Sequence, residues 1–126
     1  MCFGHQAIAG ALGCRVGKAN RAEVGWVEIE QLQSDPIFKG VPNPFRCFVS
    51  HEDEVSQLHT SVVGLARSNQ CAVHALRVVD APMWGLQFHP EMSRAEAEKL
   101  CHWRSQRHPE LNLNPSDLIA AAKPYE

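Results

Sequence analysis

Residues 1–13 have the sequence MCFGHQAIAGALG, and this stretch decides how the beginning of the chain folds. From His5 onward, Ala, Ile and Leu recur at the spacing of one helix face. Gly13 follows, as is typical of a helix C-cap. The pattern therefore predicts a helix over residues 5–13, with Cys2 just before it.

A cysteine in this position is suited to nucleophilic chemistry. At a sharp strand-to-helix turn the sulfur projects from the sheet edge, and the helix N-terminus lowers the pKa of the thiol. Gly4 provides the small neighbour that a tight turn needs, and the backbone N–H of Phe3 would point toward a developing oxyanion. By itself, the Cys-x-Gly-x-Gln pattern also fits a buried or frayed cysteine beside a helix start.

Residues 84–91, WGLQFHPE, form the second informative stretch. It is an apolar strand that ends at His89, with Pro90 favouring extended backbone and Glu91 two residues beyond. In extended chain these two side chains project to the same side, so the carboxylate would orient the imidazole as in a catalytic triad. A metal-binding pair or a plain structural histidine fits as well. A zinc deaminase does not, because the Pro-Cys-x-x-Cys segment that it requires is missing.

The rest of the chain alternates between strand and helix patterns, which favours one α/β domain with a layered sheet. The expected strands are residues 25–32, 45–51, 61–68, 71–79 and 83–88. Residues 34–45 hold three prolines and predict a surface connection with at most one helical turn. Ser93 is expected to cap a helix over 94–106 that packs through Leu100 and Trp103, and Ser116 or Asp117 to cap a last turn through Ala122.

Composition excludes several classes of function. The net charge is −2, and no basic stripe alternates with aromatic residues, so we expect no nucleic-acid partner. No apolar run is long enough for a membrane span and no signal-peptide pattern occurs. Five widely spaced cysteines without a Cys-x-x-Cys pair predict neither a disulfide framework nor a zinc knuckle. A reducing, cytoplasmic location is therefore expected.

The seven histidines show no spacing typical of metal ligands, so we expect no metal and no cofactor. The stretch HEDE at residues 51–54 resembles an acidic metal patch, but we interpret it as a substrate-loop backbone followed by a solvated turn. The remaining histidines at 59, 74, 102 and 108 are assigned to the surface or to ordinary packing.

Taken together, Cys-x-Gly-His-Gln at a helix start and Phe-His-Pro-Glu at a strand end resemble the class I, triad-type glutamine amidotransferase domain. The chain order of Cys, His and Glu is the same. The intervening stretches DPIFKGVP (35–42), SHEDEV (50–55) and LARSNQCAVHAL (65–76) are similar to the GMP-synthase-like branch. The resemblance covers about residues 1 to 95.

The resemblance implies a flavodoxin-like layered sheet and a set of roles. Cys2 would attack the side-chain amide of glutamine, His89 would act as general acid and base, and Glu91 would orient His89. Gln6 matches a glutamine that contacts the amino-acid end of the substrate. The substrate main-chain contacts would come from Ser50, His51 and Glu52, although many members have Gly at the last of these positions. No metal or cofactor is implied.

In this family several β/α units precede the nucleophile, and one of their loops contributes to the oxyanion hole. This sequence starts one residue before Cys2. We therefore expect residues 1–126 to be the C-terminal portion of a single domain, truncated before the nucleophile strand and poorly active alone. Catalytic motifs would occupy residues 1–92, and a closing helix and tail residues 93–126. The partners implied are glutamine or a γ-glutamyl substrate, and a synthetase or the missing N-terminal segment.

Three alternatives stay open. An N-terminal-nucleophile amidase would use Cys2 after removal of Met1, but its cysteine opens a β-sandwich and FHPE would have no role. A γ-glutamyl peptide hydrolase could use the same scaffold. A non-catalytic remnant could retain the packing and serve as a binding module.

Overall fold

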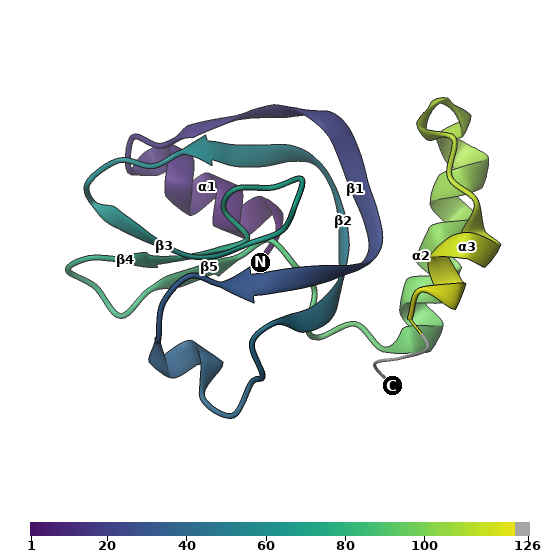
Figure 1. The fold of residues 1–126 in the computed structure, drawn as a ribbon. Helices are drawn as coiled ribbons and strands as arrows, with labels where there is room; N and C mark the ends of the chain where they lie inside the picture. Colours follow the sequence, from purple (N-terminus) through teal and green to yellow (C-terminus); the bar gives the residue numbers. More distant parts are fainter. Residues whose placement is uncertain (123–126) are drawn as a thin grey trace.

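The computed structural model describes residues 1–122 of the protein. Figure 1 shows a curled sheet with helix α1 packed against it, while α2 and α3 pack together beside the bend of β1 and β2. The elements, in chain order, are α1 (Phe3–Ala11), β1 (Arg15–Gln31), the 3-10 helix η1 (Pro36–Phe38), β2 (Phe45–Gln57), β3 (Val62–Arg67), β4 (Ala75–Val78), β5 (Trp84–Leu86), α2 (Arg94–Arg107), η2 (Pro109–Leu111) and α3 (Pro115–Ala120).

The described strands form one sheet in the order β2-β1-β3-β4-β5, and each neighbouring pair is antiparallel. Strand β1 pairs with β2 along most of its length, and its last residues, Glu30 and Gln31, pair with β3. The β1–β2 register shifts between Lys18 and Glu23, and Glu23 beyond this irregularity is buried. The predicted mixture of helices and strands is confirmed.

Two strands are shorter than predicted. Residues 71–74 precede β4 as a loop, because Ser68 N–H and the Cys71 carbonyl close it at 2.9 Å. Strand β5 stops at Leu86, and the following chain bonds to other elements instead: Gln87 N–H donates to the His74 carbonyl at 2.8 Å and His89 N–H to the Phe48 carbonyl at 2.8 Å. The HEDE stretch lies inside β2 and is not a solvated turn.

The helices differ from the prediction in their packing and caps. Ser93 caps α2 in a capping box with Glu96, as expected for the cap. Leu100 packs against the sheet side as predicted, but the buried residues of the helix are Ala97 and Cys101, and Trp103 is 49% exposed. Small side chains face the sheet here and let α2 approach Phe48 of β2.

The C-terminal helix α3 is capped by Asn114, whose side chain accepts hydrogen bonds from the N–H groups of Ser116 and Asp117. The predicted caps, Ser116 and Asp117, are therefore inside the helix. Pro115 occupies its first turn, where a missing N–H costs nothing.

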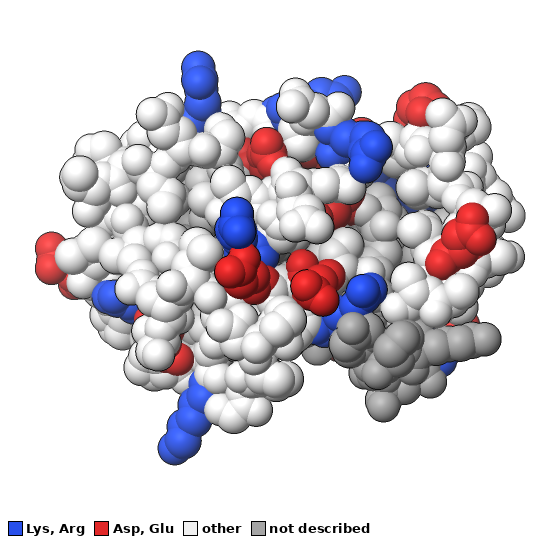
Figure 2. Space-filling view, in the orientation of Figure 1, with Lys and Arg blue, Asp and Glu red and all other residues white. Residues whose placement is uncertain are grey.

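Apolar clusters lie on both sides of the sheet. One lies between the strands and η1 and contains Ile29, Phe38, Val49, Leu65, Ala66, Ala75 and Phe88. A second lies under α1 and contains Ala9, Cys14, Val55, Val62, Val73 and Leu76. None of the described helices combines the length and the apolar character that a bilayer crossing demands. On the face seen in Figure 2, acidic and basic side chains are interspersed.

Gly85 of β5 allows α1 to lie directly on the sheet. A Cβ atom at this position would lie 2.7 Å from Nδ1 of the fully buried His5 and 3.2 Å from the His5 Cα atom. We expect Gly85→Ala to lower the free energy of unfolding by about 1–3 kcal/mol, as overpacking does. Urea denaturation followed by circular dichroism measures this. The matched control is Gly17→Ala in β1, where nothing lies within 4 Å; equal stabilities of the two variants would contradict the packing argument.

Candidate active site

Cys2 occupies a strained turn at the start of α1. Its backbone has φ 50° and ψ −106°, in the positive-φ region that residues with a side chain rarely adopt. Hydrogen bonds hold this conformation, because Cys2 N–H donates to the Leu86 carbonyl at 2.7 Å and Gln6 N–H donates to the Cys2 carbonyl at 3.1 Å. Such a turn is typical of a nucleophile presented at a helix N-terminus.

His89 follows β5 and is anchored by its own N–H to β2. Its Nδ1 lies 2.7 Å from Oε1 of Glu91, so the ring donates from Nδ1 and leaves Nε2 for the sulfur of Cys2. The contact between His89 and Glu91 was predicted on the assumption that the chain is extended here. Residues 90 and 91 instead form a turn, in which Met92 N–H approaches the His89 carbonyl at 3.4 Å.

The thiol of Cys2 and the imidazole of His89 shift each other's pKa. The pKa of Cys2 is lowered, above all by its hydrogen bond with His89; burial opposes this, while the Phe3 N–H and the Gln87 side chain add to it. The pKa of His89 is raised, first by Cys2, against burial, and then by Glu91. The arrangement therefore favours a thiolate facing an imidazolium.

Two of the predicted substrate residues lie beside Cys2. Gln6 on α1 donates from Nε2 to the Asp53 carbonyl at 2.9 Å and to Oε1 of Gln87 at 3.0 Å. The Ser50 carbonyl lies 3.9 Å from the sulfur of Cys2. The main chain of β2 and the side chain of Gln6 thus border the nucleophile.

The side chains of the other two predicted substrate residues, His51 and Glu52, contact other parts of the protein. His51 turns into the interior and its ring contacts Glu23, and Glu52 pairs with Arg104 of α2 at 3.2 Å. Only the main chain of these residues remains for a substrate contact, so that contact stays a prediction. Phe3 is 79% exposed, and its contribution to Cys2 comes through its backbone N–H.

Gln87 is a site residue that the sequence analysis missed. Its side chain is fully buried, and Nε2 donates to the sulfur of Cys2 at 3.4 Å while Oε1 accepts from Gln6. The available signal was one polar residue inside the apolar run WGLQF, two positions before His89.

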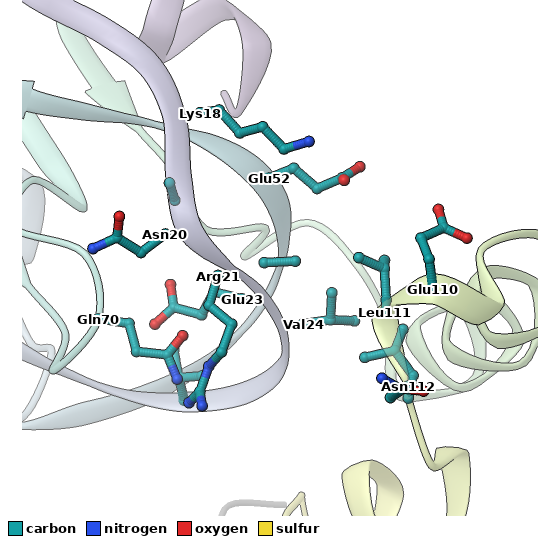
Figure 3. A pocket seen from close by; sticks show the side chains of 14 residues that line it. Lys18, Asn20, Arg21, Glu23, Val24, Glu52, Gln70, Glu110, Leu111 and Asn112 are labelled. Carbon is teal, nitrogen blue, oxygen red and sulfur yellow. The ribbon is translucent and has the colours of Figure 1, made fainter.

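A larger cavity has none of Cys2, Gln6, Gln87 and His89 in its wall, and a smaller one has His89. A solvent-open cavity of about 660 Å³ lies between β1 and the η2 segment, with Lys18, Glu23, Glu52 and Glu110 on its walls (Figure 3). A smaller cavity of about 220 Å³ is lined by His89 together with Trp26 and Phe48.

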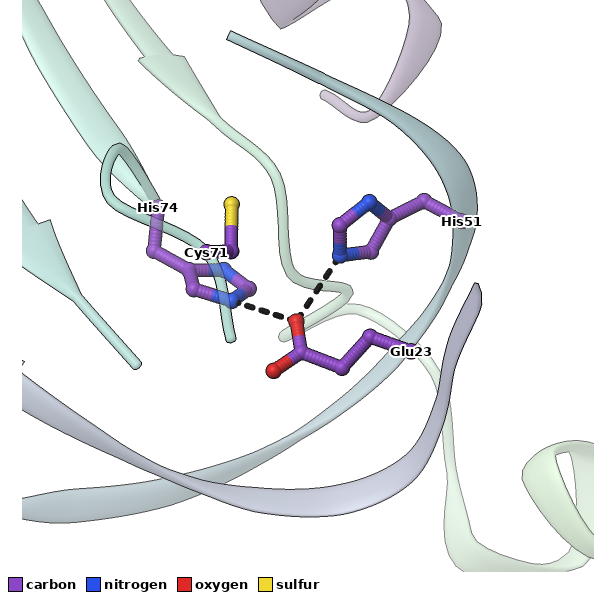
Figure 4. Close-up of side chains that lie close together, drawn as sticks. All are labelled: Glu23, His51, Cys71 and His74. Atoms are coloured by element: carbon purple, nitrogen blue, oxygen red, sulfur yellow. Dashed lines mark hydrogen bonds and ion pairs between the residues drawn. The ribbon is translucent and has the colours of Figure 1, made fainter. Parts of the chain in front are cut away.

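A separate buried cluster, shown in Figure 4, contains Glu23, His51, Cys71 and His74. Both imidazoles contact Oε1 of Glu23, at 2.8 and 2.7 Å. Burial raises the pKa of the Glu23 carboxyl, but hydrogen bonds from His51 and His74 hold it far below its usual range. His74 is therefore neither at the surface nor in ordinary packing, and within residues 1–122 these four side chains have the chemistry to hold a metal.

The electrostatics of Cys2 predict selective alkylation. Cys47 is half-buried like Cys2, but burial raises the pKa of its thiol to about 11. Since each unit of pKa changes the thiolate fraction tenfold, we expect iodoacetamide at neutral pH to modify Cys2 more than about tenfold faster than Cys47. Peptide mass spectrometry measures both rates in one sample.

The same measurement over a range of pH tests the role of His89. Alkylation of Cys2 rises as the thiolate forms, so a lowered pKa places the midpoint at a lower pH than for an ordinary thiol. His89→Ala should move this midpoint upward, and the exposed His102→Ala should not. A midpoint unaffected by loss of His89 would contradict the pairing.

The buried carboxylate of Glu23 predicts a stability effect. Removing one partner from a buried ion pair costs about 3–5 kcal/mol, so Glu23→Gln should lower the free energy of unfolding by that amount. The matched control is Glu30→Gln, also in β1, whose pair with Arg67 has both side chains 55% exposed and should contribute at most about 1 kcal/mol. Chemical denaturation of both variants measures the difference, and equal losses would refute it.

The geometry can be compared with known proteins. The family profile described as glutamine amidotransferase class-I matches residues 1–104. The chain is 45% identical over 96 residues to a subunit of the glutamine-hydrolyzing GMP synthase of Pyrococcus abyssi, covering 76% of this chain and 51% of that protein. The GMP synthase subunit of the same kind from Methanopyrus kandleri is 39% identical over 97 residues, with 76% and 52% covered. The chain thus spans about half the length of the relatives it matches.

Solved structures show the same fold. A glutamine amidotransferase from Thermotoga maritima superposes with a TM-score of 0.80 at 24% identity, covering 98% of this chain and 53% of that one. A protein from Thermoplasma acidophilum, described as a GMP synthase subunit by similarity, gives 0.70 at 28% identity, with 84% and 58% covered. The fold is that of the class I amidotransferases, and the chain belongs to the class-I glutamine amidotransferase family.

Proposed function

We propose that this chain carries the Cys-His-Glu centre of a glutamine amidotransferase, which hydrolyses the side-chain amide of glutamine through a thioester on Cys2. The observation that supports the proposal most is the arrangement of Cys2 in a positive-φ turn at a helix start, facing a histidine that Glu91 orients at 2.7 Å. A nucleophile, a base and an orienting carboxylate are the parts that acyl transfer requires.

In the first half-reaction, the thiolate of Cys2 attacks the side-chain carbonyl carbon of glutamine and forms a tetrahedral intermediate. The Phe3 N–H donates to the developing oxyanion. The carbon–nitrogen bond then breaks, and His89 gives its proton to the departing nitrogen. The products of this step are free ammonia and a γ-glutamyl thioester on Cys2.

In the second half-reaction, neutral His89 accepts a proton from water, and the resulting hydroxide attacks the thioester carbon. The carbon–sulfur bond breaks, glutamate leaves, and the thiolate is restored opposite the imidazolium. The lowered pKa of Cys2 suits this cycle, because a thiolate is a good nucleophile at neutral pH and a good leaving group afterwards.

Substrate orientation would come from the wall formed by α1 and β2. Gln6 and Gln87 share a hydrogen bond beside the sulfur, and the carbonyls of Ser50 and Asp53 face the same region. We propose that Gln6 and the main chain of residues 50–52 hold the amino-acid end of glutamine. Gln87 would keep both Gln6 and the thiolate in position.

The ammonia would be used elsewhere. The relatives are named as subunits of a glutamine-hydrolyzing GMP synthase, so we propose a synthetase partner that consumes the ammonia released here. As a member whose chain spans about half of those relatives, this protein would work together with further polypeptide rather than as the whole enzyme.

The test is covalent labelling of the full chain with a diazo-ketone analogue of glutamine. We expect one adduct per chain, on Cys2, formed more slowly when excess glutamine is present. Cys2→Ser should form none, and His89→Ala should react at least about tenfold more slowly because the thiolate is lost. Intact-protein and peptide mass spectrometry measure the adduct.

Turnover is measured in parallel as ammonia and glutamate released from glutamine, with γ-glutamyl dipeptides as a second substrate. Because the chain alone is expected to be poorly active, we expect slow release, and Cys2→Ser should abolish it. Release that survives Cys2→Ser, or labelling of Cys47 equal to that of Cys2, would refute the proposal. Hydrolysis of γ-glutamyl dipeptides in preference to glutamine would reassign the site to a γ-glutamyl peptide hydrolase.

A further inference from the structure

The cluster of Glu23, His51, Cys71 and His74 has a donor set that the proposed glutamine chemistry does not use. One donor atom from each residue lies within 4.8 Å of every other, and each residue is at most 5% exposed. Three different segments contribute: β1, β2 and the loop before β4 (Figure 4). Side chains so far apart in the sequence meet here only because of the tertiary fold.

Both ring nitrogens of His51 face hydrogen-bond acceptors, so a positive charge is required between His51 and Glu23. Nδ1 of His51 lies 2.7 Å from the Asp53 carbonyl, which can only accept, so this nitrogen carries the hydrogen. The Nε2 of the same ring faces Oε1 of Glu23, another acceptor. Either a second proton or a cation must therefore lie between the ring and the carboxylate.

The surroundings match the outer shell of a metal site. A ligating histidine usually donates its other ring hydrogen to a carbonyl or carboxylate, as His51 does to Asp53. The second oxygen of Glu23 accepts a hydrogen bond from the Ser68 hydroxyl at 2.5 Å, which orients the carboxylate and leaves Oε1 directed at the two rings. These bonds fix the orientation of the His51 ring and the Glu23 carboxylate without an ion.

We propose that Glu23, His51, Cys71 and His74 bind one divalent transition-metal ion, with Zn²⁺ as the best match. Two imidazole nitrogens, one thiolate and one carboxylate oxygen are ligands typical of zinc, whereas Mg²⁺ and Ca²⁺ require mostly oxygen ligands. This site is distinct from the proposed catalytic centre, and its assignment goes beyond the proposed function.

A tetrahedral ion would require the four donor atoms, which lie within 4.8 Å of one another, to move. Ligand atoms around zinc are about 3.3–3.6 Å apart, given bond lengths of about 2.0–2.3 Å. The two nitrogen–oxygen distances here are 2.8 and 2.7 Å, so the rings would move outward by roughly half an ångström. Glu23 forms part of the wall of the solvent-open cavity of about 660 Å³, which is the side from which an ion would approach (Figure 3).

An ion at this position would join three segments behind the catalytic centre. His51 lies between Ser50, whose carbonyl faces the sulfur of Cys2, and Asp53, whose carbonyl contacts Gln6. Binding there would hold the main chain of β2 against β1 and the loop of residues 68–74. The role of the ion is thus structural.

The test is metal titration of the full chain after chelator treatment. It uses Cys2→Ser throughout, so that the half-buried thiol beside His89 does not compete. We expect one Zn²⁺ per chain by calorimetry, a rise in Tm on binding, and no displacement by excess Mg²⁺ or Ca²⁺. Co²⁺ should produce a thiolate charge-transfer band together with the visible bands of a tetrahedral site.

Single substitutions identify which residues bind the Zn²⁺ ion. Loss of an outer-shell partner already lowers metal affinity by about 10- to 100-fold, so Cys71→Ser and His74→Gln should each lower Zn²⁺ affinity by more than about 100-fold. Cys71→Ser should also remove the charge-transfer band. The matched controls are Cys101→Ser, another buried cysteine, and the exposed His59→Ala, which should bind Zn²⁺ as tightly as the parent.

The proposal does not depend on whether these variants fold. If the folded parent chain binds no Zn²⁺ and shows no charge-transfer band with Co²⁺, the site is refuted and the cluster is a hydrogen-bonded ion-pair network only. Zn²⁺ binding that is unchanged in folded Cys71→Ser would also overturn it. Neither readout uses glutamine, so failure here is distinguishable from failure of the proposed function.

Discussion

The arrangement of this protein depends on the close contact between the first turn of α1 and strand β5. Cys2 N–H donates to the Leu86 carbonyl at 2.7 Å, and the buried ring of His5 packs over Gly85, where a side chain would collide. This contact joins the start of the chain to the stretch that leads to His89. The strained turn at Cys2 persists because the sheet supports it from below.

Strand β2 is the second organising element. Its main-chain carbonyls and its His51 side chain contribute to two different sites. Its carbonyls face the candidate active site: Phe48 binds the N–H of His89, Ser50 faces the sulfur of Cys2, and Asp53 accepts from Gln6. Its His51 side chain points into the interior and joins the cluster around Glu23. A change inside the cluster would therefore reach the catalytic residues through the main chain of one strand.

The fold and the site were predictable from sequence to different degrees. Residue types and short spacings predicted the helix after Cys2, the Ser93 cap and the contact between His89 and Glu91, because these depend on neighbours only a few positions away. The packed face of α2 was predicted only in part. Leu100 packs as expected, but the approach of Phe48 selects the small side chains of Ala97 and Cys101 over the larger Trp103. The ends of β4 and β5 also depended on bonds to distant segments.

By itself, the sequence determined the chemistry available: a cysteine at a helix start, a His-Pro-Glu segment after an apolar strand, and the family to which both belong. Only the tertiary structure decided that Gln87 contacts the sulfur of Cys2 and that two histidines contact Oε1 of Glu23. The partners of Glu23 lie 28 and 51 positions away in the chain. No local pattern encodes such contacts, because the register of β1 on β2 and the path of the loop before β4 bring the side chains together.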